Sequence, residues 1–192
     1  TLDATANGNT VDYNGAGNQT VKSTTYQNLT ISNSGTSTLA GAITVNNNLA
    51  INGGTLATST FQITGNATGT LNVAAGAGLT IGLTTSGTLP VFPTNYTTGN
   101  ITLASTSTVT YQSNVDKTIS STPSSYGSVT LSTGASTYSM TFSGTVIPIT
   151  GNLTINTSVT LTMNTDNLSV TGNLAGAGTL IFTTGNLNIG GN

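Results

Sequence analysis

Apolar residues recur along this chain in pairs, with one polar or small residue between the two members. The pairs are Val11/Tyr13, Leu29/Ile31, Ile43/Val45, Leu49/Ile51, Phe61/Ile63, Leu71/Val73, Leu79/Ile81, Ile101/Leu103, Val109/Tyr111, Val129/Leu131, Met140/Phe142, Leu153/Ile155, Leu168/Val170, Leu180/Phe182 and Leu187/Ile189. Side chains two residues apart lie on the same side of a strand, so each pair predicts a short strand with one buried side. Gly, Asn, Ser and Thr separate the pairs and favour turns, and frequent Thr and Gly disfavour helix. The pattern predicts an all-β fold.

Two all-β architectures accommodate strands this short. Successive pairs lie about 6 to 11 residues apart, so three would fill one turn of roughly 20 residues in a parallel β-solenoid. At about 4.8 Å per turn, eight or nine turns would make a rod of roughly 40 Å. Tandem β-sandwich or jelly-roll modules are the alternative, since they also place a turn every 8–12 residues. The very short pairs and the abundant Asn, which can form ladders along stacked turns, favour the solenoid.

The chain contains an internal repeat. Residues 9–32 (NTVDYNGAGNQTVKSTTYQNLTIS) align with residues 107–132 (STVTYQSNVDKTISSTPSSYGSVTLS), and this places Tyr13 on Tyr111 and Tyr26 on Tyr126. The matches continue as 47–52 with 151–156, 63–73 with 170–182, and 78–82 with 186–190. We therefore predict two modules, residues 1–98 and residues 99–192. Their join lies near residues 83–100, a segment that contains Pro90 and Pro93.

Charge is nearly absent. The 192 residues include two Lys or Arg and four Asp or Glu, with no His, Cys or Trp, and the net charge is −2. The apolar 35% of the chain is placed periodically, which argues against disorder. Two lysines cannot neutralise a run of phosphates, so nucleic acid is excluded as a partner, and no apolar run is long enough to span a membrane. A small net charge permits self-association.

The residues needed for catalysis are scarce. Glycoside hydrolysis requires two carboxyl groups that face each other across the bond, but the four aspartates, at positions 3, 12, 116 and 166, are scattered. Without His or Glu there is no conventional general acid or base and no serine triad. We expect no enzymatic activity, no catalytic residue and no cofactor.

Two features suggest other chemistry. Asp12 and Asn14, beside a glycine turn, resemble a calcium loop only faintly, and Thr110 replaces Asp12 in the second module. A turn that needs an Asx residue explains them better, so we predict no metal site. Lys117 beside Asp116 suggests an isopeptide cross-link, but an exposed turn pair is the simpler interpretation.

Three residue types are candidates for modification or for ligand binding at the surface. Asn18, Asn95 and Asn100 begin N-x-[ST] triplets and are candidate glycosylation sites, although such triplets are no more frequent than this composition produces by chance. Thr108 and Thr110 place two hydroxyls on one strand side, as in ice-binding solenoids, yet most strands read apolar–Thr–apolar. The matched tyrosines are interpreted as caps of the core or of turn corners rather than as sugar-binding platforms.

The segments TVDYNGAGNQTV and TYQNLTIS, followed by GNLTIN and LNIGGN, resemble repeats of very large Bacteroidetes surface adhesins. These adhesins are secreted by the type IX system and include the gliding-motility adhesins. The resemblance covers nearly the whole chain and implies an extracellular, cell-surface location. In that family GGN is followed by a short polar run and a TVxYNG segment, so the last residues here read as leading into another copy.

We therefore expect a structural protein, a stiff solenoid segment of a surface adhesin or filament that stacks end to end. The expected assembly ends are Thr1, Leu2, Leu187, Ile189 and Asn192. The expected partners are copies of the chain or adjacent repeats, with surface polysaccharide as a further candidate. A pilus or thread subunit linked by donated strands, and a carbohydrate-binding adhesion module, are the alternatives.

Overall fold

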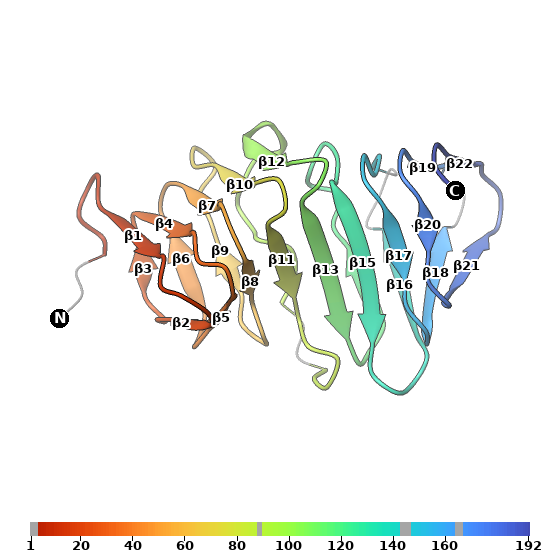
Figure 1. The fold of residues 1–192 in the computed structure, drawn as a ribbon, viewed down its shortest axis with the longest axis horizontal. Coiled ribbons are helices and arrows are strands. Elements are labelled where there is room, and N and C mark those ends of the chain that lie inside the picture. The colour runs from red at the N-terminus through yellow and green to blue at the C-terminus, as the bar shows by residue number, and fades with distance from the viewer. Residues whose placement is uncertain (1–3, 88–89, 143–146, 164–166) are drawn as a thin grey trace.

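A computed structural model of the chain describes residues 4–87, 90–142, 147–163 and 167–192. The chain winds as a parallel β-solenoid of about 9 turns, and its strands follow one another along the long axis of the molecule (Figure 1). All pairings between the named strands are parallel. The predicted solenoid is therefore confirmed, and the β-sandwich alternative was wrong.

The strands of the described residues form five sheets, which occupy three faces of the solenoid. Face 1 carries β1 (Thr10–Tyr13), β4 (Asn28–Ile31), β7 (Leu49–Ile51), β10 (Leu71–Val73) and β12 (Ile101–Leu103). Face 2 carries β2 (Gln19–Val21), β5 (Thr36–Leu39), β8 (Thr55–Ala57), β11 (Gly78–Ile81), β13 (Thr108–Ser113), β15 (Ser128–Thr133), β17 (Leu153–Ile155) and β20 (Leu174–Ala175). Face 3 carries β3 (Thr25–Tyr26), β6 (Ile43–Val45) and β9 (Ile63–Thr64).

Two further sheets continue these faces in the second half of the chain. One contains β14 (Lys117–Ile119), β16 (Tyr138–Phe142), β18 (Val159–Met163) and β21 (Thr179–Phe182), and the other contains β19 (Leu168–Val170) and β22 (Leu187–Ile189). After each face-2 strand of this half, the chain passes through the sheet of β14, β16, β18 and β21, and then through the side of the solenoid that carries β19 and β22. In the order of winding, the sheet of β14, β16, β18 and β21 therefore continues face 3, and the sheet of β19 and β22 continues face 1.

The length of a turn follows from the register. Thr10 pairs with Asn28, an advance of 18 residues, and Leu29 pairs with Leu49, an advance of 20. Leu71 pairs with Ile101, an advance of 30, because the segment from residue 82 to the short 3-10 helix η1 (Thr98–Asn100) is a long loop. The join predicted at residues 83–100 falls on this segment.

Most of the predicted apolar pairs form the core, but Leu187 and Ile189 in the last turn lie outside it. Both members are buried in β4, β7, β10 and β11, with exposures of 0%. The pair Phe61/Ile63 is an exception, because β9 begins at Ile63 and the backbone N–H of Phe61 donates to Thr58 in a turn. At that site a tight turn overrides the two-residue apolar spacing.

Some strands have no apolar pair and were missed. In β5 one inward position is Ser37, which is fully buried and whose hydroxyl donates to the side-chain oxygen of Asn33 at 3.2 Å. In β14 one inward position is Lys117, only 5% exposed. Pairing with apolar strands of neighbouring turns places these segments in the stack despite their polar inward residues.

A column of glycines marks the corner before face 2. The backbone N–H of Gly151 donates to Gly127, that of Gly172 to Gly151, and that of Gly191 to Gly172, at 2.9, 2.9 and 3.0 Å. The turns pack so closely that a Cβ on Gly172 would lie 2.6 Å from the carbonyl oxygen of Gly151. Glycine is therefore required by the close approach of stacked turns.

Asparagines beside this column form the expected ladder. The side-chain oxygen of Asn152 accepts from the backbone N–H of Asn173, and that of Asn173 accepts from the N–H of Asn192, both at 2.9 Å. Before face 1, the side-chain oxygen of Asn28 accepts from the amide of Asn47 at 2.9 Å. The recurring GN dipeptides of the sequence are thus corner residues, and their asparagine side-chain oxygens accept hydrogen bonds from backbone N–H groups of the next turn.

The two predicted modules belong to one continuous stack. Face 1 crosses the predicted boundary through the pairing of β10 with β12, and face 2 crosses it through the pairing of β11 with β13. The division at residues 98 and 99 stays a prediction about sequence repetition.

Candidate functional site: the open last turn

The last turn consists of β20, β21 and β22, each of which ends its sheet and pairs only with a strand of the preceding turn. Figure 1 shows these strands at the end of the rod opposite β1. Ile181 and Leu187 are 44% and 41% exposed, while Leu180 and Phe182 are half-buried. Among the described residues, no strand pairs with the far edge of this turn, and apolar side chains lie along it.

The last turn also continues the corner columns. Gly191 and Asn192 extend the glycine column and the asparagine ladder, and Asn192 is exposed. Residues 167–192 contain no charged residue. A further turn could therefore stack there without removing a charge from water.

The predicted assembly ends are only partly described. Leu187 is exposed and Ile189 half-buried in β22, and Asn192 lies in the corner column, so these three residues share the last turn. Thr1 and Leu2 lie outside the described residues. Ile181 was missed; the signal for it is an apolar residue at an outward strand position where neighbouring strands have threonine, as in the register pair Thr162 and Ile181.

The first turn has a different character. β1 ends its sheet, but its inward residues Val11 and Tyr13 are half-buried. The carbonyl oxygen of Ala4, a buried residue, accepts from the backbone N–H of Gln27 at 2.7 Å. Residues before β1 therefore contribute to the stack on face 3.

Two tyrosines close a ring of hydrogen bonds near the first turn. The backbone N–H of Lys22 donates to the Tyr13 hydroxyl at 2.9 Å, the two tyrosine hydroxyls lie 3.0 Å apart, and the Tyr26 hydroxyl donates to the Lys22 carbonyl at 2.6 Å. Since Tyr26 gives its proton to Lys22, Tyr13 must donate to Tyr26. We call this ring the first tyrosine relay.

The second tyrosine relay has the same connections. The N–H of Ser120 donates to the Tyr111 hydroxyl at 3.2 Å, the hydroxyls of Tyr111 and Tyr126 lie 2.7 Å apart, and Tyr126 donates to the Ser120 carbonyl at 2.7 Å. The side chains of Tyr111 and Tyr126 are fully buried, and burial raises the pKa of both phenols. The two relays confirm the matched tyrosine positions and place Tyr26, Tyr111 and Tyr126 in the core.

Lys117 lies beside the second relay. Its ammonium donates to the carbonyl oxygen of Pro90 at 3.0 Å and lies 5.9 Å from the ring centre of Tyr111. Burial lowers the pKa of Lys117 to about 8. Asp116 accepts from the N–H of Ser139 at 2.8 Å. The predicted exposed turn pair was therefore wrong, because Lys117 is an inward residue of β14.

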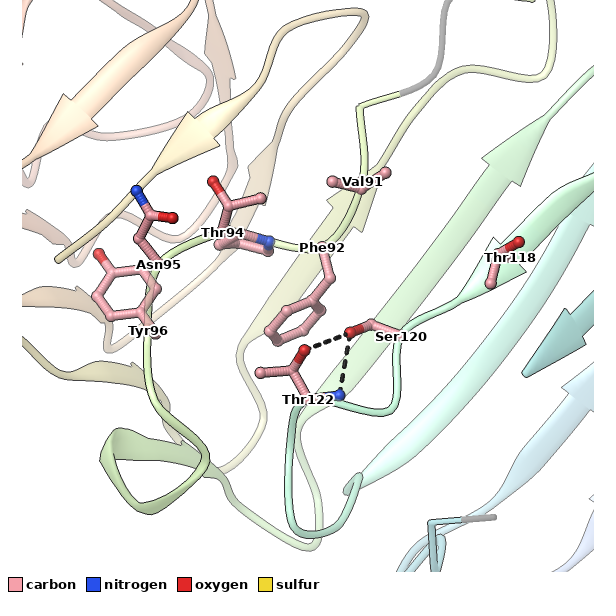
Figure 2. A pocket seen from close by; sticks show the side chains of 9 residues that line it. Val91, Phe92, Thr94, Asn95, Tyr96, Thr118, Ser120 and Thr122 are labelled. Atoms are coloured by element: carbon pink, nitrogen blue, oxygen red, sulfur yellow. Dashed lines mark hydrogen bonds between the residues drawn. The ribbon is translucent and has the colours of Figure 1, made fainter. Parts of the chain in front are cut away.

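The long loop between β11 and β12 forms a pocket with the segment after β14. A cavity of about 380 Å³ is lined by Val91, Phe92, Asn95, Tyr96, Thr118 and Thr122, among others (Figure 2). Figure 2 shows the ring of Phe92 directed toward Ser120 and Thr122, and the Ser120 hydroxyl lies 3.0 Å from that of Thr122.

Aromatic contacts anchor this loop. The Phe92 ring meets Tyr126 edge to face, with ring centres 6.3 Å apart. The Tyr96 ring lies against Gly65, where any Cβ would collide with it. The pocket therefore belongs to a loop that is packed onto the core.

The other predicted surface residues are placed as follows. Asn18 and Asn95 are exposed, and Asn95 has a positive φ of 66°; Asn100 is half-buried and its amide donates to Ala67 at 2.9 Å. The carboxylate of Asp12 accepts from the Ser32 hydroxyl at 2.6 Å. Within the described residues no group of three or more His, Cys, Asp or Glu side chains could hold a metal ion.

The outward side of face 2 carries a column of threonines. In register from turn to turn, it reads Thr20, Thr38, Ala57, Thr80, Thr110, Thr130, Thr154 and Ala175. Thr108, which shares the outward side of β13 with Thr110, is paired with Gly78 and Ser128 in the neighbouring turns. A regular double row of threonine hydroxyls is therefore interrupted at the neighbouring turns.

No family model, curated protein or solved structure matches this chain. Among the residues that the structure describes, no helix has the length and apolarity needed to cross a membrane.

Proposed function

We propose that this chain is a structural segment of an extracellular, cell-surface adhesin or filament, and that it stacks end to end through its last turn. The observation that supports the proposal most directly is the open edge of β20, β21 and β22 with Ile181 and Leu187 exposed on it. An added turn would extend the parallel ladders and cover these side chains. Both backbone pairing and apolar burial would then favour association.

The chemistry of the long sides fits a structural role. Face 2 presents neutral hydroxyls in the threonine column, and the whole chain has a net charge of −2. Such sides offer neither strong charge nor a large apolar area for lateral packing. Association is therefore directed to the ends. The donated-strand alternative assumed β-sandwich subunits and receives no support from a solenoid.

Substitutions at the open end test this proposal. Ile181→Lys and Leu187→Lys, combined, place two charges on the last turn and should convert assemblies into single chains in sedimentation velocity. Val91→Lys is the matched control, since Val91 is 52% exposed but lies in the loop at the side of the rod. If the wild-type chain sediments as a single chain at all concentrations, or if Val91→Lys disrupts assembly equally, end-to-end stacking is contradicted.

The pocket supports a second candidate, the binding of a neutral polysaccharide segment. Its lining combines the exposed hydroxyl and amide groups of Thr118 and Asn95 with the buried rings of Phe92 and Tyr96, and these exposed polar groups can hydrogen-bond the hydroxyls of a neutral sugar. Asn95→Gly tests this, because glycine accepts the positive φ while the amide is lost. Calorimetry with neutral oligosaccharides should show binding that this variant weakens; no binding by the wild-type chain would contradict the candidate.

A further inference from the structure

Eight N-x-[ST] triplets occur in the chain, and the structure separates them by the accessibility of their residues. All eight lie within the described residues. An enzyme that attaches a glycan to asparagine must bind all three residues of the triplet, so a triplet with a buried residue is closed to it in the folded chain. The eight asparagines are Asn18, Asn28, Asn66, Asn95, Asn100, Asn152, Asn156 and Asn167.

Five triplets have a middle residue that belongs to the core. These middle residues are Leu29, Tyr96, Ile101, Leu153 and Leu168, and each is at most 6% exposed. Four of them are inward residues of strands β4, β12, β17 and β19, and the ring of Tyr96 lies against Gly65. Binding of such a triplet would require a turn to leave the stack. The asparagines of these five triplets are therefore closed to glycan transfer.

Two further triplets are held by their neighbours. Gln19, the middle residue after Asn18, is half-buried, and its side-chain oxygen accepts a backbone hydrogen bond at 3.1 Å. The side-chain oxygen of Asn18 itself accepts from the backbone N–H of Thr36 in the next turn at 2.8 Å. In the remaining one of these two triplets, both Asn156 and Ser158 are half-buried. Neither triplet is freely accessible.

The triplet Asn66, Ala67 and Thr68 is the one among the eight in which all three residues are exposed. It lies in the turn between β9 on face 3 and β10 on face 1, and the backbone N–H of Gly69 closes this turn by donating to the Asn66 carbonyl at 3.1 Å. The Ala67 carbonyl accepts from the side-chain amide of Asn100 at 2.9 Å. The backbone of the turn is therefore anchored while its three side chains remain accessible.

The hydrogen bonds inside this turn prepare the carboxamide of Asn66 for reaction. The hydroxyl and the backbone N–H of Thr68 both donate to the side-chain oxygen of Asn66, each at 3.0 Å. Two donors stabilise the negative charge that this oxygen gains when the side-chain nitrogen loses a proton. In Asn28 and Asn100, by contrast, the side-chain nitrogen is occupied, because it donates to a backbone carbonyl.

We propose that Asn66 is the site of N-linked glycosylation of this chain. The glycan donor is an oligosaccharide diphosphate carried on a lipid. The side-chain nitrogen of Asn66 forms a bond to the anomeric carbon of the sugar, and the bond from that carbon to the diphosphate oxygen breaks. The diphosphate leaves with the electron pair, and one proton passes from the nitrogen to a base of the transferring enzyme. This inference rests on the extracellular location in the proposed function.

The glycan would lie at the side of the rod. Figure 1 shows β9 and β10 in the half of the molecule that contains β1, away from the last turn. A glycan between them leaves the edge of β20, β21 and β22 uncovered. It also opposes lateral contact between rods, because its hydroxyl groups would lose water there. Glycosylation at Asn66 is therefore compatible with end-to-end stacking.

Glycopeptide mapping of the chain purified from its own cells tests the proposal. Access to the other triplets requires local opening of a turn, so we expect occupancy at Asn66 to be at least about 10-fold higher than at any of them. Asn66→Gln should remove the glycan. Asn95→Gln is the matched control and should leave it in place, since Asn95 is exposed but is followed by the buried Tyr96. An unmodified Asn66, or glycans chiefly on other triplets, would overturn the proposal.

Transfer by a purified oligosaccharyltransferase from a lipid-linked oligosaccharide tests whether the fold selects the site. The folded chain should be modified at Asn66, whereas peptides from a digest of the same chain should be modified at several triplets. Thr68→Ala should lose the transfer and Thr68→Ser, which keeps the hydroxyl, should retain it. If the folded chain stays unmodified while a reference acceptor peptide is modified in the same reaction, the proposal is overturned.

Two measurements distinguish this inference from the proposed function. Antibody labelling of intact cells tests the location: a surface-exposed chain with an unmodified Asn66 contradicts the glycosylation alone, whereas a chain found inside the cell contradicts the proposed location and the glycosylation with it. Sedimentation of the native chain tests stacking. A glycan on Asn66 in chains that sediment singly supports this inference and contradicts end-to-end stacking.

Discussion

The hydroxyl groups of Tyr111 and Tyr126 lie 2.7 Å apart inside the core, and together they satisfy both backbone groups of Ser120. Tyr13 and Tyr26 do the same for Lys22. The residue between the tyrosines contributes only its backbone, which explains why a lysine and a serine occupy equivalent places. The relay thus ties the end of one strand to the corner of the turn.

Removal of one relay hydroxyl should destabilise the fold. Tyr126→Phe leaves the half-buried Ser120 carbonyl without its hydroxyl donor and the buried Tyr111 hydroxyl without the acceptor of its proton, which costs about 1–3 kcal/mol of unfolding free energy. Urea unfolding followed by circular dichroism measures this. Tyr138→Phe, at a half-buried tyrosine outside the relays, is the control and should cost clearly less. Equal losses in both variants would contradict the relay's role.

The buried lysine should make stability rise with pH in the alkaline range. Lys117 has a folded-state pKa of about 8 against an ordinary value of 10.5, so between these values the unfolded chain binds more protons. The free energy of unfolding therefore increases from about pH 8 toward pH 10.5, by less than about 1.4 kcal/mol per pH unit, the limit for one proton. Lys117→Met should abolish this increase, whereas the exposed Lys22→Met should preserve it.

The buried tyrosines should reverse the trend at higher pH. Burial raises the pKa of Tyr26, Tyr96, Tyr111 and Tyr126 above the ordinary value of 10.0, so above pH 10 the unfolded chain loses protons that the folded chain retains. Stability should therefore pass through a maximum near pH 10 and then fall. Thermal unfolding from pH 7 to pH 12 tests this; a monotonic rise across that range would contradict the burial of these phenols.

A methyl group in the glycine column should be costly. Gly172→Ala places a Cβ 2.6 Å from the carbonyl oxygen of Gly151, and because this neighbour is backbone, the turns must separate. We expect a loss of about 1–3 kcal/mol in the free energy of unfolding. Gly99→Ala is the matched control, since no atom lies within 4 Å of its added Cβ, and it should be close to neutral. A neutral Gly172→Ala would show that the stacking at this corner is looser than the structure has it.

The strands could be predicted wherever the alternation of apolar and polar side chains shows which residues point into the core. Pairs such as Leu49/Ile51 and Leu153/Ile155 have the two-residue period of a buried strand side, and their pairing in stacked turns is confirmed. Lys117 could not be placed, because a charged residue at an inward position gives no apolar signal, and its partner, the Pro90 carbonyl, is a backbone group 27 residues away.

Only part of the candidate site could be predicted, because the sequence pattern does not show which outward residues remain exposed. Leu187 and Ile189 were expected at an assembly end because they belong to an apolar pair near the last residues. Ile181 lies between Leu180 and Phe182, and its exposure depends on which turn is last in the stack. The relays were foreseen as matched tyrosines, but their hydrogen bonds join residues on different faces and could not be derived from spacing.

Electron microscopy of the purified chain, with averaging along the rod axis, tests end-to-end stacking most directly. We expect unbranched rods longer than one chain, with an axial repeat of about 4.8 Å that continues without interruption across the junctions between copies. Single short particles at every protein concentration, or rods whose axial repeat is broken at each junction, would contradict the account.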